Sequence, residues 1–334
     1  MIIAVDAMGG DFAPASVVQG VIQAIATTTD TFQILLLGDK EAIRQQLGDF
    51  QSSRLEILPT TEIVTMDDRA SKVIKTKPDS SLVKGIRLVQ DQEADAFVSA
   101  GNTGAVMTTS LLTYGRIKNV KRPALSAYIP TLSGGKILCD VGANPDVKPY
   151  HLLQFAIMAS YYFEHIEGYS NPKIGLINIG AEETKGSELY RETHQLFKSQ
   201  LPGFIGNIEG RNIMDSEAHI LICDGFVGNT LLKFAEGWIK IFSDEIKSKL
   251  RENYRYQIGA YLLKPVFKSL NKKFDYEEHG GTPLLGVNGL SIITHGSAGP
   301  KAIANSILVA QKCINENLVG HIQQNVESYL GVMN

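Results

Sequence analysis

The sequence predicts an α/β protein with a mostly parallel sheet and helices on both of its faces. Short apolar runs alternate with helix-like segments along almost the whole chain, which is typical of this class. One of these runs, 174–179, is apolar on both sides and therefore predicts a strand buried on both faces. We find no internal repeat, low-complexity tract or linker, so we expect one α/β domain over 1–334.

Taken in order, the apolar patterns predict these elements. Strands are expected at 2–7, 32–37, 55–58, 96–99, 125–129, 136–141, 174–179, 204–208, 219–223 and 284–294. Helices are expected at 16–26, at 40–47, from Ser80 or Ser81, from AGNTG to Tyr114, at 149–164, at 187–198 and at the C-terminus. Asp39 and Ser187 can cap two helices, 62–78 predicts a polar connection, and a turn at 133–135 joins two adjacent strands.

Composition narrows the class of protein. Hydrophobic residues make up 44% and charged residues 20% of the chain, which is typical of a soluble globular protein. A formal net charge of -3 gives no reason to expect a nucleic-acid partner. The three cysteines have no paired spacing, which favours a reducing, cytoplasmic compartment. Asp6 interrupts the first apolar run, so we expect no signal peptide, and the uncharged stretch 96–115 is too polar for a membrane span.

Four predicted strands end in loops of one kind, rich in glycine and neutral hydrogen-bond donors. These loops are DAMGGD, SAGNTG, DGFVGN and HGSAG. Glycine lets the backbone approach a ligand, and donors beside a helix N-terminus favour an anion such as phosphate. Each loop alone also fits an ordinary tight turn, and none matches a P-loop or a dinucleotide fingerprint. Because all four follow strands, we expect them to meet at one edge of the sheet.

Ionisable residues near these loops are candidates for chemistry or for bracing. They are Asp6, Asp11, Asp140, Lys185, Asp224 and His295. Each aspartate at a strand end can instead hold its loop by accepting backbone N–H groups. Lys185 offers a positive charge to phosphate or to an oxyanion, and His295 offers proton transfer. Cys139 and Cys223 lie in apolar runs, which favours core thiols over nucleophiles.

The motifs of the chain also carry a family resemblance. The chain resembles the bacterial phosphate acyltransferase family of phospholipid synthesis, through AVDAMGGDFAP, KPDSS, SAGNTGA, KRPAL, DVGAN, GLINIGAEETKG, GNIEGR, CDGFVGN, LLGV and HGSAG in that order. The resemblance implies transfer of an acyl group from acyl carrier protein to inorganic phosphate. It also implies a homodimer without metal or nucleotide, and a product that passes to a membrane glycerol-3-phosphate acyltransferase. The implied fold is the three-layer α/β/α fold of isocitrate and isopropylmalate dehydrogenases and phosphotransacetylase.

Combined with the resemblance, the residues give a hypothesis for the site. Phosphate is already a nucleophile, so the enzyme has to align it with the thioester carbonyl and stabilise the oxyanion. The catalytic candidates are Lys185, Asp224, His295 and Asn229. The candidates for binding phosphate or substrate are Asp6, Gly9, Gly10, Ser99, Gly101, Asn102, Thr103, Asn144, Asn178 and Gly180.

One region has the pattern of a basic amphipathic helical hairpin, at 238–275. Between 240 and 273 nine basic and three acidic residues leave a charge of +6, and apolar residues recur at helical spacing. We expect an apolar turn at 258–263. Three interpretations stay open: packing on the core or a second subunit, contact with a membrane surface, or docking of acidic acyl carrier protein. The predicted contact residues are Leu262, Leu263, Lys264 and Lys268.

The chain has a smaller basic cluster at 69–77, and two other classes of function also fit the sequence. Arg69, Lys72, Lys75 and Lys77 either help to hold the carrier protein or form a solvated face. The alternative functions are a coenzyme A-dependent phosphotransacetylase and a non-catalytic scaffold at the membrane. A dehydrogenase would need a cofactor fingerprint or a carboxylate metal site, and the sequence has neither. With the hairpin interpreted as a membrane contact, the expected location is cytoplasmic and peripherally membrane-associated.

Overall fold

The structure is a computed structural model that describes residues 1–28, 32–131, 134–274 and 276–331. Its strands are β1 (Ile2–Asp6), β2 (Gln33–Gly38), β3 (Leu55–Pro59), β4 (Ala96–Ser99), β5 (Ala124–Thr131), β6 (Gly134–Cys139), β7 (Ile174–Asn178), β8 (Phe204–Glu209), β9 (Ile220–Ile222), β10 (Thr282–Leu285) and β11 (Ser291–Ile293). Within the described residues they form one sheet in the order β3-β2-β1-β4-β11-β10-β5-β6-β9-β7-β8.

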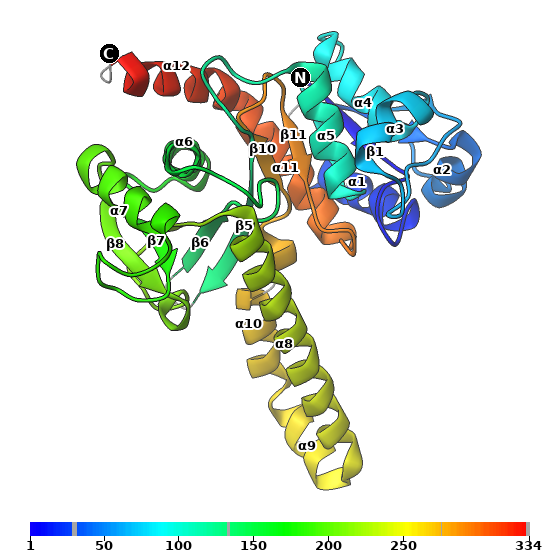
Figure 1. The fold of residues 1–334 in the computed structure, drawn as a ribbon. Helices are drawn as coiled ribbons and strands as arrows, with labels where there is room; N and C mark the ends of the chain where they lie inside the picture. Colours follow the sequence, from blue (N-terminus) through cyan, green and yellow to red (C-terminus); the bar gives the residue numbers. More distant parts are fainter. Residues whose placement is uncertain (29–31, 132–133, 275, 332–334) are drawn as a thin grey trace.

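Helices cover this sheet and confirm the predicted α/β class (Figure 1). They are α1 (Ala15–Thr27), α2 (Lys40–Leu47), α3 (Ala70–Thr76), α4 (Ser81–Gln90), α5 (Thr103–Tyr114), α6 (Pro149–Tyr162), α7 (Glu188–Gln200), α8 (Gly225–Glu252), α9 (Tyr254–Leu262), α10 (Lys264–Phe274), α11 (Pro300–Asn315) and α12 (Leu318–Gly331). Among the described residues, no helix is both long and apolar enough to cross a membrane.

The sheet contains two parallel blocks that run in opposite directions. β1, β2, β3, β4 and β11 are parallel to one another, and so are β6, β7, β8 and β9. Between the blocks, β10 is antiparallel to both β11 and β5, and β5 is antiparallel to β6. The three reversals turn the second block against the first. We call the two blocks with their helices the first lobe and the second lobe.

Two apolar cores fill the space between the sheet and its helices. On one face, strand residues pack against α1, α2, α6, α7, α11 and α12. On the other face, α3, α4 and α5 cover the first lobe, whereas α8 is the one described α-helix that contributes to this cluster over the second lobe, through Val227, Leu231 and Leu232. The result is a three-layer arrangement whose second outer layer is thin over the second lobe.

Several local predictions are confirmed and several are wrong. Asp39 caps α2 by accepting the Ala42 N–H at 2.8 Å, and Ser80 caps α4. Ser187 occupies the cap position of α7 but makes no side-chain cap bond. The predicted connection 62–78 contains α3, and the predicted strand 284–294 is the antiparallel pair β10 and β11. Part of the predicted turn at 133–135 lies outside the described residues.

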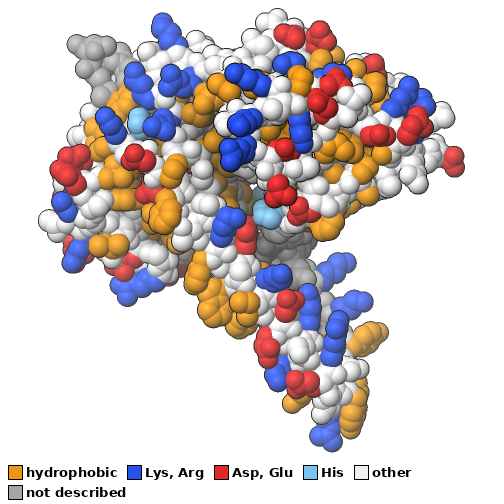
Figure 2. Space-filling model, turned by 45° about the vertical axis from the view of Figure 1, so that its right-hand side comes forward, with side chains coloured by type: hydrophobic (Ala, Val, Ile, Leu, Met, Phe, Trp, Pro, Cys, Tyr) orange, Lys and Arg blue, Asp and Glu red, His pale blue; other side chains and the backbone are white. Residues whose placement is uncertain are grey.

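The end of α8, together with α9 and α10, projects away from both lobes (Figure 1). We call residues 237–274 the stalk. Where the sequence predicted an apolar turn at 258–263, the structure has the helix α9. Apolar side chains gather near the base and the tip of the stalk, with lysines and arginines along it (Figure 2). The exposed apolar residues include Trp238, Phe242, Tyr261, Leu262, Leu263 and Val266.

Candidate active site

A cavity of about 580 Å³ lies where the two lobes meet. From the first lobe it is lined by the loops after β4 and β11, and from the second lobe by the loop after β6 and the first turns of α8. β5 and the start of β10 supply further lining residues. β10 has four residues and β11 three, so strand ends on opposite edges of the sheet are only about 10–13 Å apart there.

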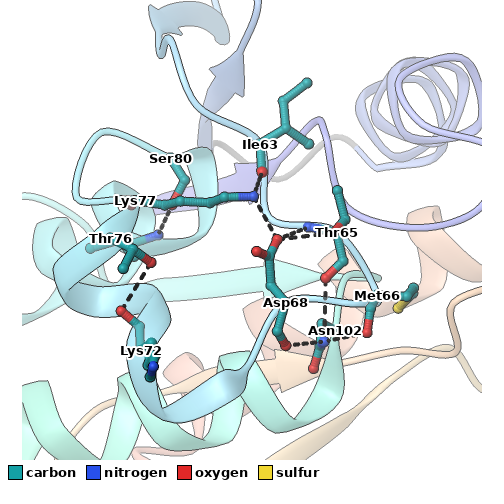
Figure 3. Close-up of polar contacts among 10 residues, drawn as sticks. Ile63, Thr65, Met66, Asp68, Lys72, Thr76, Lys77, Ser80 and Asn102 are labelled. Carbon is teal, nitrogen blue, oxygen red and sulfur yellow. Dashed lines mark hydrogen bonds and ion pairs between the residues drawn. The ribbon is translucent and has the colours of Figure 1, made fainter.

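The N-terminus of α5 forms one side of this cavity. Gly101, Thr103 and Gly104 line it, and the first N–H groups of a helix favour an anion. Asn102 does not line the cavity, and its Nδ2 points to the loop that precedes α3 (Figure 3). Its Oδ1 accepts the Ala105 N–H at 3.0 Å, and its Nδ2 donates to the carbonyl oxygen of Met66 at 3.0 Å. Asn102 therefore caps α5 and fixes the preceding loop.

The first three turns of α8 form the opposite side. Asp224 caps this helix, since its Oδ1 accepts the Val227 N–H at 2.9 Å and its Oδ2 accepts the Tyr190 hydroxyl at 2.7 Å. Asp224 does not line the cavity, but Asn229 does. α8 can approach the loop after β6 because residue 228 is glycine: a Cβ there would lie 1.9 Å from the Asp140 carbonyl oxygen. The cap and this glycine place Asn229 at the cavity wall.

His295 lines the cavity from the loop after β11. The Ser297 backbone N–H donates to its Nδ1 at 3.2 Å, so the neutral imidazole carries its proton on Nε2. Nε2 lies 3.5 Å from Oε1 of Glu236 on α8. The imidazole therefore connects the two lobes at the cavity and is open to substrate, because about half of its side chain is exposed.

The buried carboxylates Asp6 and Asp140 brace loops, which is one of the two roles that the sequence left open. Asp6 accepts the hydroxyls of Ser81 at 2.5 Å and Ser99 at 2.7 Å, and its burial raises its pKa. Asp140 accepts the backbone N–H of Asn144 at 2.6 Å and its Nδ2 at 2.9 Å, and burial raises the pKa of Asp140 as well. Ser99 and Asn144 therefore take part in this bracing and do not line the cavity.

Gly9, Gly10 and the two candidate thiols also lie outside the cavity lining. A Cβ on Gly9 would be 2.4 Å from Asp6 Oδ2, and Gly10 has a φ of 105°, so both positions shape the loop after β1. Cys139 and Cys223 are fully buried, and their burial raises their pKa values far above the ordinary value. This burial confirms the prediction that both are core thiols.

The loop after β7 lies apart from this cavity. Asn178, Gly180 and Lys185 do not line it. The Asn178 Nδ2 donates to the Lys185 carbonyl at 3.1 Å, which closes the loop on itself, while the Lys185 side chain is exposed. β6 and β9 separate β7 from β5, so this loop starts about 14 Å from the strand at the cavity floor. The expectation that the four glycine-rich loops meet at one edge is wrong for DGFVGN, because β9 runs opposite to β1, β4 and β11 and therefore ends at the other edge of the sheet. The loop after β7 leaves that other edge as well.

Comparisons with known proteins agree with this architecture. Residues 1–320 match the sequence family described as "Fatty acid synthesis protein". The chain belongs to this family. A relative from Desulfitobacterium hafniense named "Phosphate acyltransferase" is 47% identical over 98% of both chains, and one of the same name from Heliobacterium modesticaldum is 46% identical over 98% of both. A phosphotransacetylase from Streptococcus pyogenes has the same fold, with a TM-score of 0.58, 16% identity and 94% of each chain covered.

Two lining residues on α8 were not predicted from the sequence, although helical spacing could have found them. Lys233 and Glu236 follow Asn229 by four and seven residues on α8, so they lie on the same face of the helix, and both line the cavity. Among the described lining residues, Lys233 is the lysine or arginine that supplies positive charge. The apolar lining had no local signal, because Met66, Met107, Leu125, Val141, Leu232 and Ile293 come from six separate segments.

Proposed function

We propose that this protein is a phosphate acyltransferase that moves an acyl group from the thioester of acyl carrier protein to inorganic phosphate. The observation that carries the proposal is the cavity between the lobes, which combines a helix N-terminus, an amide, a lysine and a histidine with an apolar wall. The names of the relatives support the reaction class. The carrier-protein donor rests on the resemblance of the sequence motifs.

In this proposal phosphate lies between the N-terminus of α5 and the first turns of α8. The backbone at Thr103 and the side chain of Asn229 are donors on the cavity wall, whereas the Gly101 N–H donates to Ser99 Oγ at 2.9 Å. Lys233 supplies one positive charge, which the two carboxylates of Asp11 and Glu236 in the same lining outweigh, so the helix N-terminus and the neutral donors have to supply the rest of the attraction for phosphate. Met107, Leu125 and Leu232 are among the apolar lining residues that suit an acyl chain.

The chemistry is a direct acyl transfer. A phosphate oxygen attacks the thioester carbonyl carbon, a tetrahedral oxyanion forms, and its collapse breaks the carbon–sulfur bond and releases the carrier thiol. Donors fixed near the oxyanion lower the barrier because they need no reorganisation during the reaction. The proton of the attacking phosphate passes to the departing sulfur, and the Nε2–H of His295 donates a hydrogen bond to the oxygen that gains charge. Asp224 acts indirectly in this scheme, since both of its oxygens hold α8 and Tyr190.

The predicted roles of Lys185 and Asn178 require a second copy of the chain. Lys185 is exposed and lies outside the cavity of its own chain. In the same lobe, Ile179 is 81% exposed and Phe226 is 67% exposed, and apolar side chains this open favour a covering subunit. The thin helical cover over the second lobe points the same way. We therefore propose the homodimer that the sequence predicted, with Lys185 delivered to the partner subunit's cavity.

The stalk supports the proposed peripheral contact with a membrane. Tyr261, Leu262 and Leu263 at its tip are at least half exposed, and the exposed Lys264 and Lys268 follow them. Apolar insertion together with about 1 kcal/mol for each lysine near an anionic surface would give reversible attachment. The wild-type protein should sediment with vesicles of anionic lipid, whereas a Leu262→Glu, Leu263→Glu variant should stay in the supernatant. Unchanged sedimentation of that variant would exclude the tip as the contact.

The reaction itself is tested with purified protein, palmitoyl-carrier protein and phosphate. We expect acyl-phosphate, trapped as a hydroxamate, and free carrier thiol in equal amounts. A phosphotransacetylase would instead require coenzyme A or acyl-coenzyme A, and a scaffold would give no product with either donor. Omitting phosphate is the control, because any thiol released without it reports hydrolysis.

A further inference from the structure

We propose that the basic face of α3 is the docking surface for an acidic carrier protein that presents the acyl thioester to the cavity. The proposal rests on the proposed function and adds the place where the donor binds. Residues 69–77 contain four basic residues and no acidic one, on a protein whose net charge is -3. Arg69, Lys72 and Lys75 recur every third residue, which places them on one side of this short helix.

The structure separates the fourth basic residue, Lys77, from the other three. Lys77 Nζ lies 2.6 Å from Asp68 Oδ2 and 2.6 Å from the carbonyl oxygen of Ile63, and it is half-buried (Figure 3). This contact lowers the pKa of Asp68. Lys77 therefore holds the loop that precedes α3. The side chains of Arg69, Lys72 and Lys75 are exposed, and no described carboxylate lies within 4.0 Å of them.

This basic face adjoins the cavity through fixed contacts. Asn102 Nδ2 donates to the carbonyl oxygens of Thr65, Met66 and Asp68, and Asp68 immediately precedes Arg69 (Figure 3). Met66 itself lines the cavity. On α3, Ala70 packs so close to α5 that a Cβ added at Gly104, another lining residue, would lie 3.4 Å from the Ala70 Cβ. Arg69 therefore follows the lining residue Met66 by three positions, and the helix that carries the other two cations packs against α5 at the cavity.

The stalk is the competing basic surface, and its distance argues against it as the dock. α8 lines the cavity as far as Glu236, and the helix continues for sixteen residues to Glu252. At 1.5 Å per residue, the far end of α8 is roughly 24 Å from the cavity. A donor bound there would have to span that length, whereas one bound on α3 is already at the mouth. Complementary charge on the partner would speed association and orient the thioester.

The test compares two charge reversals of equal size. One variant is Arg69→Glu, Lys72→Glu, Lys75→Glu, and its matched control on the stalk is Lys247→Glu, Lys249→Glu, Arg251→Glu, which also reverses one arginine and two lysines. We expect the α3 variant to raise the KM for palmitoyl-carrier protein roughly tenfold or more, with kcat nearly unchanged, and the control to stay within about twofold. Raising the salt concentration should raise the KM of the wild-type protein for palmitoyl-carrier protein, and so reduce its difference from the KM of the α3 variant.

Two further measurements keep the outcome decisive. The KM for palmitoyl-pantetheine, an uncharged donor, should be the same in the α3 variant and the wild type, and an equal rise for both donors would overturn the proposal. Binding of a fluorescent carrier protein, followed by anisotropy, should weaken by a similar factor in the α3 variant alone. That assay needs no turnover, so absence of acyl-phosphate from every donor would refute the proposed function and still leave docking tested. Unchanged anisotropy would refute docking on α3.

Discussion

The loop after β4 and the loop after β7 begin alike and end in different surroundings. Each follows a buried strand, contains glycine and leads into a helix, and each has an asparagine, in the loop after β4 and at the last position of β7. The first places Gly101 and Thr103 in the cavity between the lobes. The second folds back on itself through Asn178 and leaves Lys185 exposed outside it. The difference comes from strand order, because β4 lies beside the short central strands and β7 lies beyond β6 and β9.

The comparison teaches that a polar loop at a strand end is only a candidate until its neighbours in the sheet are known. The same holds for single side chains at a helix start, as Asn102 and Ser187 show. Both occupy the cap position of a helix, but of these two side chains only that of Asn102 accepts a backbone N–H. Four predictions test this contrast, from the largest expected effect to the smallest.

The largest effect is expected at the cavity wall. Asn229→Ala removes a neutral donor proposed to hold phosphate and the oxyanion, so kcat/KM should fall by about 10²–10³-fold. The measurement is the initial rate of acyl-phosphate formation over a range of phosphate concentrations. Thr230→Ala is the matched control, since Thr230 is the next residue of α8, bonds to the Phe226 carbonyl and does not line the cavity. A rate within threefold for both variants would remove Asn229 from the site.

The role of the loop after β7 is tested by Lys185→Ala, measured alone and in a mixture with Asn229→Ala. If Lys185 serves the partner subunit's cavity, kcat/KM should fall roughly tenfold or more. Co-refolding Lys185→Ala with Asn229→Ala should then restore activity, because a mixed dimer has one cavity with both groups intact. Loss of activity without restoration would confine Lys185 to its own chain, and near-normal turnover of Lys185→Ala would exclude it from the mechanism.

The caps of the two helices give a smaller effect, on stability. Asn102→Ala removes the cap of α5 and the bonds to the preceding loop, so the free energy of unfolding should fall by about 2 kcal/mol. Ser187→Ala should change it by less than about 0.5 kcal/mol, because Ser187 makes no side-chain cap bond. Urea denaturation of both variants measures the difference. Asn102→Asp keeps the cap acceptor but sets a carboxylate oxygen against the carbonyl oxygens of Thr65, Met66 and Asp68, so it should be at least as destabilising as alanine.

The smallest expected effect is a pH dependence at the other end of β7. The His219 Nδ1 accepts the Lys173 N–H at 2.9 Å, and burial together with Lys136 and Lys173 lowers the pKa of His219 below its ordinary value of 6.5. The unfolded chain then binds more protons than the folded one below pH 6.5, so this histidine lowers stability as the pH falls through that range. Thermal melts should drop between pH 7.5 and 5.5 and drop less in His219→Gln.

The sequence by itself determined most of the elements and a minor part of the candidate site. Apolar runs fix which segments become buried strands, and Asp39 and Ser80 mark helix starts, because these effects depend on neighbours within a few residues. Asn229, Gly101, Thr103 and His295 were predicted at the site and lie in the cavity lining. Local patterns could find them because each lies in or next to a glycine-rich turn after a strand.

Only the tertiary structure decided which of these turns share a cavity. The reversal through β10 and β5, the exclusion of Lys185 and the lining role of Met66 all depend on contacts between segments far apart in the chain. The difference between Lys77, which holds a loop, and Lys72, which is exposed, is of the same kind. Spacing along the chain gives the side of an element on which a residue lies, whereas strand order and packing determine what faces it.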